Sequence, residues 1–146
     1  MKIKYDFSLM KFISMFEHET HARIKDCFVD QKDQALVFVV EPGELGKAVG
    51  KQGAHVKRFE QKLRKKVRVI AFHPEKLQFI QNMIMPLRVR SIEETPDGVV
   101  IIDGGDARTR GLLIGRAAQN LRNLEENVRR YFKVKEIRVI QGTGRI

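Results

Sequence analysis

The apolar and polar positions in the first half of the chain predict an alternation of helices and strands. Apolar residues three and four positions apart predict a helix that Ser8 caps and that ends near His21. Two strand-like runs, Ile24–Val29 and Ala35–Val40, follow on either side of a polar turn. The remaining predicted elements of this half are a short helix over Glu44–Val49, a helix from about Ala54 that buries Val56, Phe59 and Leu63, and a strand over Val67–Phe72. The predicted order is therefore α-β-β-α-α-β.

The second half of the chain predicts the same order. Its predicted elements are a helix from Pro74 and Glu75 to Met85, strands over Leu87–Glu94 and Val99–Asp103, a short helix through Ile114, a helix over about Gln119–Tyr131, and a strand over Glu136–Ile140. The only break between the halves is His73-Pro74, with no Gly/Ser-rich linker. The prediction is an α+β protein of two closely packed domains, residues 1–73 with the N-terminal helix and residues 74–146. Each domain is expected to be a three-stranded sheet covered by helices.

The two halves also match residue by residue at an offset of 65 positions. Gly46–Gly53 then lies over Gly111–Ala118, and Phe59 lies over Leu124 within the same apolar stripe of the next helix. The second copy is about five residues longer before its last strand. A repeat of this length indicates a duplicated structural unit.

The distribution of charge along the chain indicates what kind of partner the protein binds. The 146 residues contain 28 Lys plus Arg against 18 Asp plus Glu, a formal net charge of +10. Residues 44–70 hold nine Lys or Arg against two acids, and residues 107–138 hold nine against three. The excess is local and occurs once in each copy, so an anionic partner such as nucleic acid is expected.

Composition excludes several other classes of protein. The share of hydrophobic residues, 42%, is too high for a disordered tail. No apolar stretch approaches the roughly 18 residues of a membrane helix, and no secretory signal pattern is present, so no membrane partner and a cytoplasmic location are expected. The single cysteine, Cys27, excludes an internal disulfide framework and is expected to be buried in a strand.

The turn Gly50-Lys51-Gln52-Gly53 separates two predicted helices in the first basic segment. Glycine permits positive φ and close approach of another backbone, and the N–H groups that open the following helix favour an anion such as phosphate. A helix–helix turn without a ligand is the alternative. The candidate RNA-binding residues of this copy are Lys47, Gly50, Lys51, Gln52, Gly53, His55, Lys57 and Arg58.

This pattern resembles the KH domain, whose GXXG loop clamps about four nucleotides of a single strand. The element order resembles the type II arrangement. Phe16-Glu17, Asp26-Cys27, the stretch Val39–Gly53 and Ile80-Gln81-Asn82 followed by Pro86 are similar to the archaeal NusA-like transcription factors, which are two tandem KH domains. The resemblance implies binding of single-stranded RNA, a role in transcription elongation, termination or antitermination, and RNA polymerase as a candidate partner.

The second loop, Gly115-Arg116-Ala117-Ala118, has alanine in place of the last glycine. Alanine resists positive φ, so Ala118 is expected to be helical and the second loop to clamp backbone less closely. The first copy is therefore expected to be the better-formed clamp, while the second extends the surface. The candidate RNA-binding residues of this copy are Arg110, Gly115, Arg116, Asn120 and Arg122.

Other functions find less support in the residues. His18 and His21 lack a third metal ligand, and Asp103 and Asp106 fall at turns, where carboxylates are ordinary. No phosphate-binding loop of nucleotide hydrolases and no nucleophile elbow is present. The expectation is thus a protein that is not an enzyme, without metal, cofactor or small-molecule substrate, and a monomer by default.

Three rival functions and one structural choice stay open at this level. The rivals are a KH protein that binds ribosomal RNA in ribosome assembly or translation, a metal-dependent RNA-processing enzyme, and an adaptor whose basic faces meet an acidic protein. Arg68 and Arg138 hold matching mid-strand positions. They either line the floor of a binding groove or face solvent.

Overall fold

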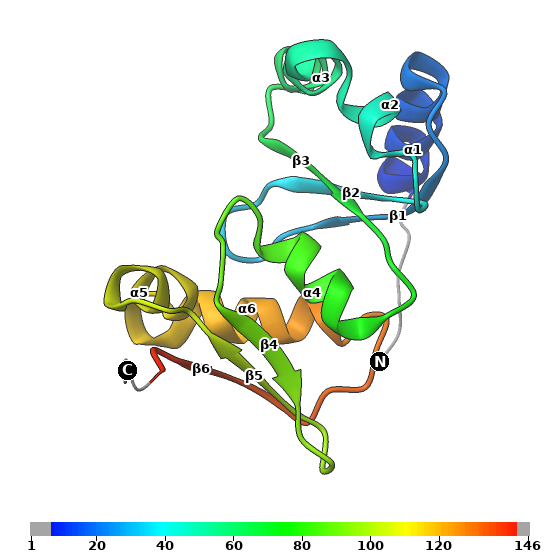
Figure 1. Ribbon diagram of the computed structural model, residues 1–146. Helices are drawn as coiled ribbons and strands as arrows, with labels where there is room; N and C mark the ends of the chain where they lie inside the picture. Colours follow the sequence, from blue (N-terminus) through cyan, green and yellow to red (C-terminus); the bar gives the residue numbers. More distant parts are fainter. Residues whose placement is uncertain (1–6, 143–146) are drawn as a thin grey trace. The chain divides into compact units, whose positions relative to one another are not determined.

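The computed structural model describes residues 7–142, and the chain divides into two compact units between His73 and Pro74 (Figure 1). Each unit contains one three-stranded sheet and its own helices. No helix within residues 7–142 is both long enough and apolar enough to span a bilayer.

The first unit has the predicted order of helices and strands. Its elements are α1 (Phe7–Thr20), β1 (Ile24–Val29), β2 (Leu36–Val40), α2 (Leu45–Val49), the 3₁₀ turn η1 (Lys51–Gly53), α3 (Ala54–Leu63) and β3 (Val67–Ala71). The sheet order is β1-β2-β3, with β1 antiparallel to β2 and β2 parallel to β3. Two adjacent parallel strands need a long crossover connection. Here α2, the glycine loop and α3 supply it, which places the loop at the turn between two helices.

Three phenylalanine rings join the elements of the first unit. Phe16 from α1 stacks on Phe38 from β2 with ring centroids 4.2 Å apart, and Phe59 from α3 meets both rings edge-on at 5.0 and 5.9 Å. All three side chains are buried. Such aromatic pairs add to the area they bury, so this cluster holds α3, and with it the loop that precedes α3, against the sheet.

The second unit repeats this architecture. Its elements are α4 (Lys76–Ile84), β4 (Ser91–Glu94), β5 (Val99–Asp103), α5 (Ala107–Ile114), the 3₁₀ turn η2 (Arg116–Ala118), α6 (Gln119–Val128) and β6 (Glu136–Ile140). The sheet order β4-β5-β6 again combines an antiparallel and a parallel pair. Its core contains Ile80 from α4, Val100 from β5 and Ile137 from β6, all fully buried, with Leu121 and Leu124 from α6.

Some predicted element ends are wrong. Ser8 does not cap α1, because the helix already includes Phe7. The helix ends at Thr20, in agreement with the predicted end near His21, because His21 adopts a left-handed φ of 61°. Its last turn is closed by the Thr20 hydroxyl, which donates to the carbonyl oxygen of Phe16 at 2.7 Å.

The start of β4 is also later than predicted. Leu87 and Val89 pack against the core of the second unit, as their apolar character suggests, but they do not belong to a strand. The N–H of Leu87 instead donates to the carbonyl of Ile84 at 3.0 Å, so the chain is still turning out of α4 at this point. Pairing begins beyond it, where the N–H of Arg90 reaches the carbonyl of Asp103 at 2.8 Å.

Helix α6 ends at Val128, three residues before the predicted end. Arg129 organises the longer connection that follows, because its guanidinium donates to the carbonyl oxygens of Val134 and Lys135 at 3.0 and 2.7 Å. These side-chain bonds take the place of further helical turns, and the connection reaches β6 without extending α6.

Candidate nucleic-acid interface

The first glycine loop has an unusual backbone at three of its four positions. Gly50 has φ 81° and ψ 171°, a combination that is essentially restricted to glycine. Gln52 and Gly53 are left-handed, with φ 55° and 75°. This sequence of conformations turns the chain sharply from α2 into α3 and leaves the tip, Lys51 and Gln52, exposed.

The second loop repeats this backbone almost angle for angle. Gly115 has φ 75° and ψ 177°, and Ala117 and Ala118 have φ 53° and 61°. The prediction that Ala118 is helical is therefore wrong. Buried residues on both sides of the turn, Leu113 in α5 and Leu121 in α6, set the path that the loop must follow. Packing thus outweighs the local preference of alanine, at a cost of about 1 kcal/mol for a left-handed non-glycine residue.

The two glycine positions of the motif differ in how much space they leave. A Cβ on Gly50 would lie 2.9 Å from Cγ and Nδ1 of His55, and a Cβ on Gly115 would lie 2.5 Å from Cγ of Asn120. A Cβ on Gly53 would meet only the side chain of Lys57, at 3.9 Å. The first glycine is therefore required by both conformation and space, whereas only the left-handed conformation favours glycine at the last position, where the second loop has alanine.

His55 and Asn120, both predicted as RNA contacts, form equivalent bonds within the protein. Nδ1 of His55 lies 3.0 Å from the carbonyl oxygen of Lys47, and Nδ2 of Asn120 donates to the carbonyl oxygen of Leu112 at 2.8 Å. The two residues of each pair are eight positions apart, so each bond connects the helices on either side of its loop. One polar group of each side chain is thus already used by the protein.

The structure places most of the predicted cations at exposed positions in or beside the loops. Lys47 is only loosely paired, with its Nζ 3.9 Å from a carboxylate oxygen of Glu44. Within residues 7–142, five predicted cations form no ion pair: Lys51, Lys57, Arg58, Arg110 and Arg116. These side chains are available to neutralise phosphates.

Arg122 is the exception among the predicted cations. Its Nη1 donates to Oε1 of Glu125 at 2.7 Å, and this contact raises the pKa of the Arg122 guanidinium. Glu125 is itself buried and accepts the N–H of Ile137 at 2.7 Å through Oε2. Arg122 is therefore paired with the buried carboxylate of Glu125, and it is not one of the unpaired cations near the loop.

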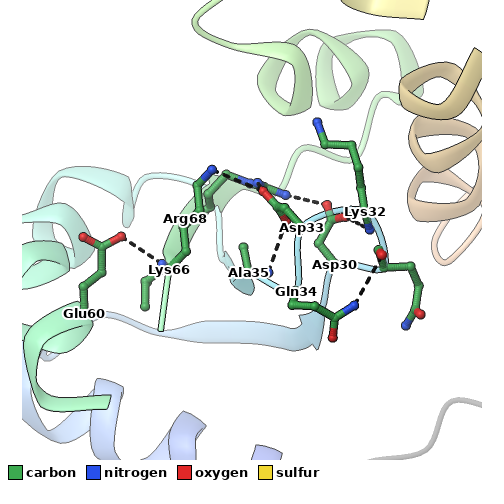
Figure 2. A network of polar contacts seen from close by, with 10 residues as sticks. Asp30, Lys32, Asp33, Gln34, Ala35, Glu60, Lys66 and Arg68 are labelled. Carbon is green, nitrogen blue, oxygen red and sulfur yellow. Dashed lines mark hydrogen bonds and ion pairs between the residues drawn. The ribbon is translucent and has the colours of Figure 1, made fainter. Parts of the chain in front are cut away.

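Arg68 is engaged in a network that no pattern in the sequence signals (Figure 2). Its guanidinium pairs with Asp30 and, at 2.7 Å, with Asp33, both in the turn between β1 and β2. Lys66 adds a second cation 3.2 Å from Asp33. Arg68 thus ties β3 to this turn and does not line a groove floor as a free cation.

Asp33 shows the electrostatic effect of the network. Partial burial tends to raise the pKa of its carboxyl, but the backbone N–H of Ala35 and the positive charges of Arg68 and Lys66 outweigh burial and lower that pKa. Strand β6, the counterpart of β3 in the second unit, lacks this arrangement. Its Arg138 is exposed and pairs at 3.3 Å with Glu136 on the same strand. Periodicity along the chain does not report contacts of this kind between a strand and a distant turn.

The carboxylates and the thiol that are candidates for metal ligands or catalytic groups have structural roles. Asp103 accepts the N–H of Gly105 at 2.9 Å, and Asp106 caps α5 by accepting the N–H of Thr109 at 2.7 Å. Cys27 is buried in β1. Among residues 7–142, no group of three His, Cys, Asp or Glu side chains could hold a metal ion.

Comparison with known proteins places this fold in a family. Residues 12–78 match the family model of the KH domain. A probable transcription termination protein NusA from Methanococcus vannielii is 31% identical over 144 residues, covering 97% of this chain and 82% of the relative. A protein of the same name from Halobacterium salinarum is 28% identical, covering 95% of this chain and 99% of the relative.

A solved structure supports the fold over most of the chain. The crystal structure of APE1850 superposes with a TM-score of 0.72 at 22% identity, covering 92% of this chain and 99% of that one. Two units with the same α-β-β-α-α-β order, each with a glycine loop between its second and third helices, agree with the tandem type II KH arrangement. The chain therefore belongs to the archaeal NusA family of tandem KH proteins.

Proposed function

We propose that this chain binds single-stranded RNA through its two glycine loops and acts as a NusA-like factor in transcription elongation, termination or antitermination. The observation that carries the proposal is the shared backbone of the two loops, which persists although their sequences differ at three of four positions. A conformation maintained against the preference of Ala117 and Ala118 indicates a constraint on the shape of the loop itself.

The loops combine three features that suit a sugar-phosphate backbone. Gly53 and Ala118, the residues that precede α3 and α6, provide no side-chain cap. The first N–H of each helix donates to the carbonyl oxygen of Lys51 or Arg116, and the N–H groups that follow it in the first turn would meet an anion. Lys51 and Arg116 stand exposed at the loop tips. The exposed tip residues bring no bulky apolar group that would keep a strand away. Phosphates would lie on the loops, and bases would extend toward β3 and β6.

The role in transcription rests on the family. The relatives from Methanococcus vannielii and Halobacterium salinarum are both named as probable transcription termination proteins. RNA polymerase is accordingly the proposed protein partner, and co-purification of the tagged chain with polymerase would test it. We propose no catalytic activity, since the candidate carboxylates, Asp103 and Asp106, serve backbone turns.

Fluorescence anisotropy with a labelled single-stranded RNA of about 12 nucleotides tests RNA binding directly, with single-stranded DNA and duplex RNA as competitors. The loop-one variant carries Lys51→Asp with Gln52→Asp, and the loop-two variant carries Arg116→Asp with Ala117→Asp. Each variant should lose affinity because acidic tips repel phosphate. The slope of affinity against salt should also flatten, by about 0.7 for each phosphate of the single strand that the protein no longer neutralises.

A matched control separates the loops from total charge. Lys11→Asp with Ser14→Asp changes the charge by the same amount at exposed positions of α1. This control should bind RNA nearly as well as the wild type. Equal losses in all three variants would reduce the interaction to bulk electrostatics, and unchanged binding in both loop variants would exclude the loops as the site.

A further inference from the structure

His55 and Asn120 hold the same place in the two units although their side chains differ. They lie 65 positions apart in the sequence, and so do the residues whose carbonyls they approach, Lys47 and Leu112. Each carbonyl belongs to the helix before the loop, and each side chain belongs to the first turn of the helix after it. The bond therefore links the two helices across the loop.

The chemistry of the two bonds is the same. A carbonyl oxygen can only accept, so Nδ1 of His55 must carry the hydrogen, as the amide nitrogen of Asn120 does. An imidazole Nδ1–H and a carboxamide N–H thus supply one donor at one position. This donor function does not need a positive charge, because it is present in the neutral ring and in an amide that never ionises.

Each side chain also fills the space beside the first glycine of its loop. Gly50 has room for no Cβ because of His55, and Gly115 has room for none because of Asn120. The 3₁₀ turns η1 and η2 contain no buried residue of their own, so these contacts add to the packing of the flanking helices. The hydrogen bond and the close packing on glycine together restrict the path between the helices.

We infer that His55 and Asn120 are positioning residues, which hold the glycine loops in the shape that receives phosphate and do not act on RNA through their own charge. The inference rests on the proposed function for its effect on RNA binding. It replaces the prediction that these two residues are direct RNA contacts, and it explains how one donor function is kept by two chemically different residues.

The residue that each unit has at this position is the natural conservative substitution to test in the other unit. His55→Ala should weaken binding of the 12-nucleotide RNA about fivefold, the value of one net hydrogen bond, whereas His55→Asn should recover most of the loss. Asn120→Ala and Asn120→His should behave in the same way. His18→Ala, which removes an exposed histidine from α1, is the matched control and should leave affinity unchanged.

Two results would overturn the inference. Binding that is unchanged in both alanine variants would show that the bonds do not position the loops. Binding lost equally in His55→Ala and His55→Asn would mean that the imidazole ring itself contacts the RNA.

NMR of the free protein separates this inference from the proposed function. The neutral His55 ring should be the Nδ1–H tautomer, and relaxation of the amides of residues 50–53 should report greater motion in His55→Ala than in the wild type or in His55→Asn. If the wild type binds no RNA but these amides respond as expected, the proposed function fails and the positioning role stands. If RNA binds but the amides of His55→Ala stay as rigid as those of the wild type, the positioning role fails alone.

Discussion

At the scale of single residues, the glycine loops owe their shape to unequal demands on their positions. Gly50 and Gly115 combine a backbone conformation that suits only glycine with a side chain packed directly against them. The last position demands only a left-handed backbone, and alanine occupies it in the second loop. The residue between these positions that is also left-handed, Gln52 or Ala117, shows that the tip tolerates ordinary side chains.

Gly53→Ala should therefore be far milder than Gly50→Ala. The first substitution copies Ala118 and should lower the free energy of unfolding by about 1 kcal/mol, with RNA affinity close to that of the wild type. The second forces a Cβ onto His55 in a glycine-only conformation. It should lower the free energy of unfolding by about 2 kcal/mol or more and weaken RNA binding at least tenfold. Urea unfolding and anisotropy measure the two effects.

The reciprocal substitution supplies the control. Ala118→Gly relieves a left-handed alanine and should raise the free energy of unfolding by a few tenths to about 1 kcal/mol. Equal costs for Gly50→Ala and Gly53→Ala would contradict the unequal demands on the two positions.

At the scale of elements, buried or half-buried carboxylates join helices and turns to the parallel edge strands. Glu60 on α3 accepts the N–H of Val67 at 2.9 Å, and Glu125 on α6 accepts the N–H of Ile137 at 2.7 Å. In the first unit, Asp33 and Asp30 add a second tie, between the β1–β2 turn and β3 through Arg68. The start of each crossover strand is thus held by side chains as well as by the backbone ladder.

The tie through Asp33 should make the stability of the first unit sensitive to acid. The pKa of Asp33 is lower in the folded protein than its ordinary value, so its contribution is fully present above that ordinary value, about 3.9. The contribution is lost as pH falls through the folded value. Asp33→Asn should therefore cost about 0.5–1 kcal/mol at pH 7, and the difference from the wild type should shrink below pH 4. Urea unfolding at pH 7 and at pH 3 measures it.

Glu126→Gln, at an exposed position of α6, serves as the control for this pH comparison and should stay close to the wild type at both pH values. A deficit of Asp33→Asn that is the same at pH 3 and pH 7 would mean that the ionised carboxylate does not stabilise the fold.

The sequence predicts elements well where the information is local. The strands Ile24–Val29 and Val99–Asp103 are confirmed to the residue, because each run borders a polar turn that fixes one of its ends. Tertiary contacts decide the rest. Packing of α5 and α6 overrides the helical preference of Ala118, and Arg68 meets Asp33 across 35 positions, a separation that periodicity does not report. At the site, glycines and charges could be read directly, but the bonds of His55 and Asn120 to the preceding helices could not.

At the scale of the whole molecule, the chain carries two units that each contain a core and a glycine loop. The core of the first unit draws on residues 9–71 and that of the second on residues 77–139. A single chain crossing, between His73 and Pro74, joins them. If both loops bind RNA as proposed, one strand held by both would bind with an affinity that neither loop reaches alone, because the second binding event becomes intramolecular.

The length of the RNA should therefore matter most when both loops are intact. The wild type should bind a 12-nucleotide RNA at least tenfold more tightly than one of about five nucleotides, which fills a single clamp of roughly four. The loop-two variant, Arg116→Asp with Ala117→Asp, should lose most of this dependence on length. Anisotropy with the two RNAs and the two proteins completes the comparison. A dependence that survives in the variant would show that the second loop adds nothing to the binding of longer RNA.

The first glycine of each loop packs so closely against the residue five positions later that a Cβ would not fit. This contact has a consequence for finding such loops in other chains. A search for Gly-x-x-Gly selects Gly50–Gly53 and passes over Gly115–Ala118. A search for glycine followed five positions later by histidine or asparagine selects both, since it encodes the contact that the backbone requires. A pattern that requires both glycines would treat the second copy as degenerate, although its loop has the same shape as the first.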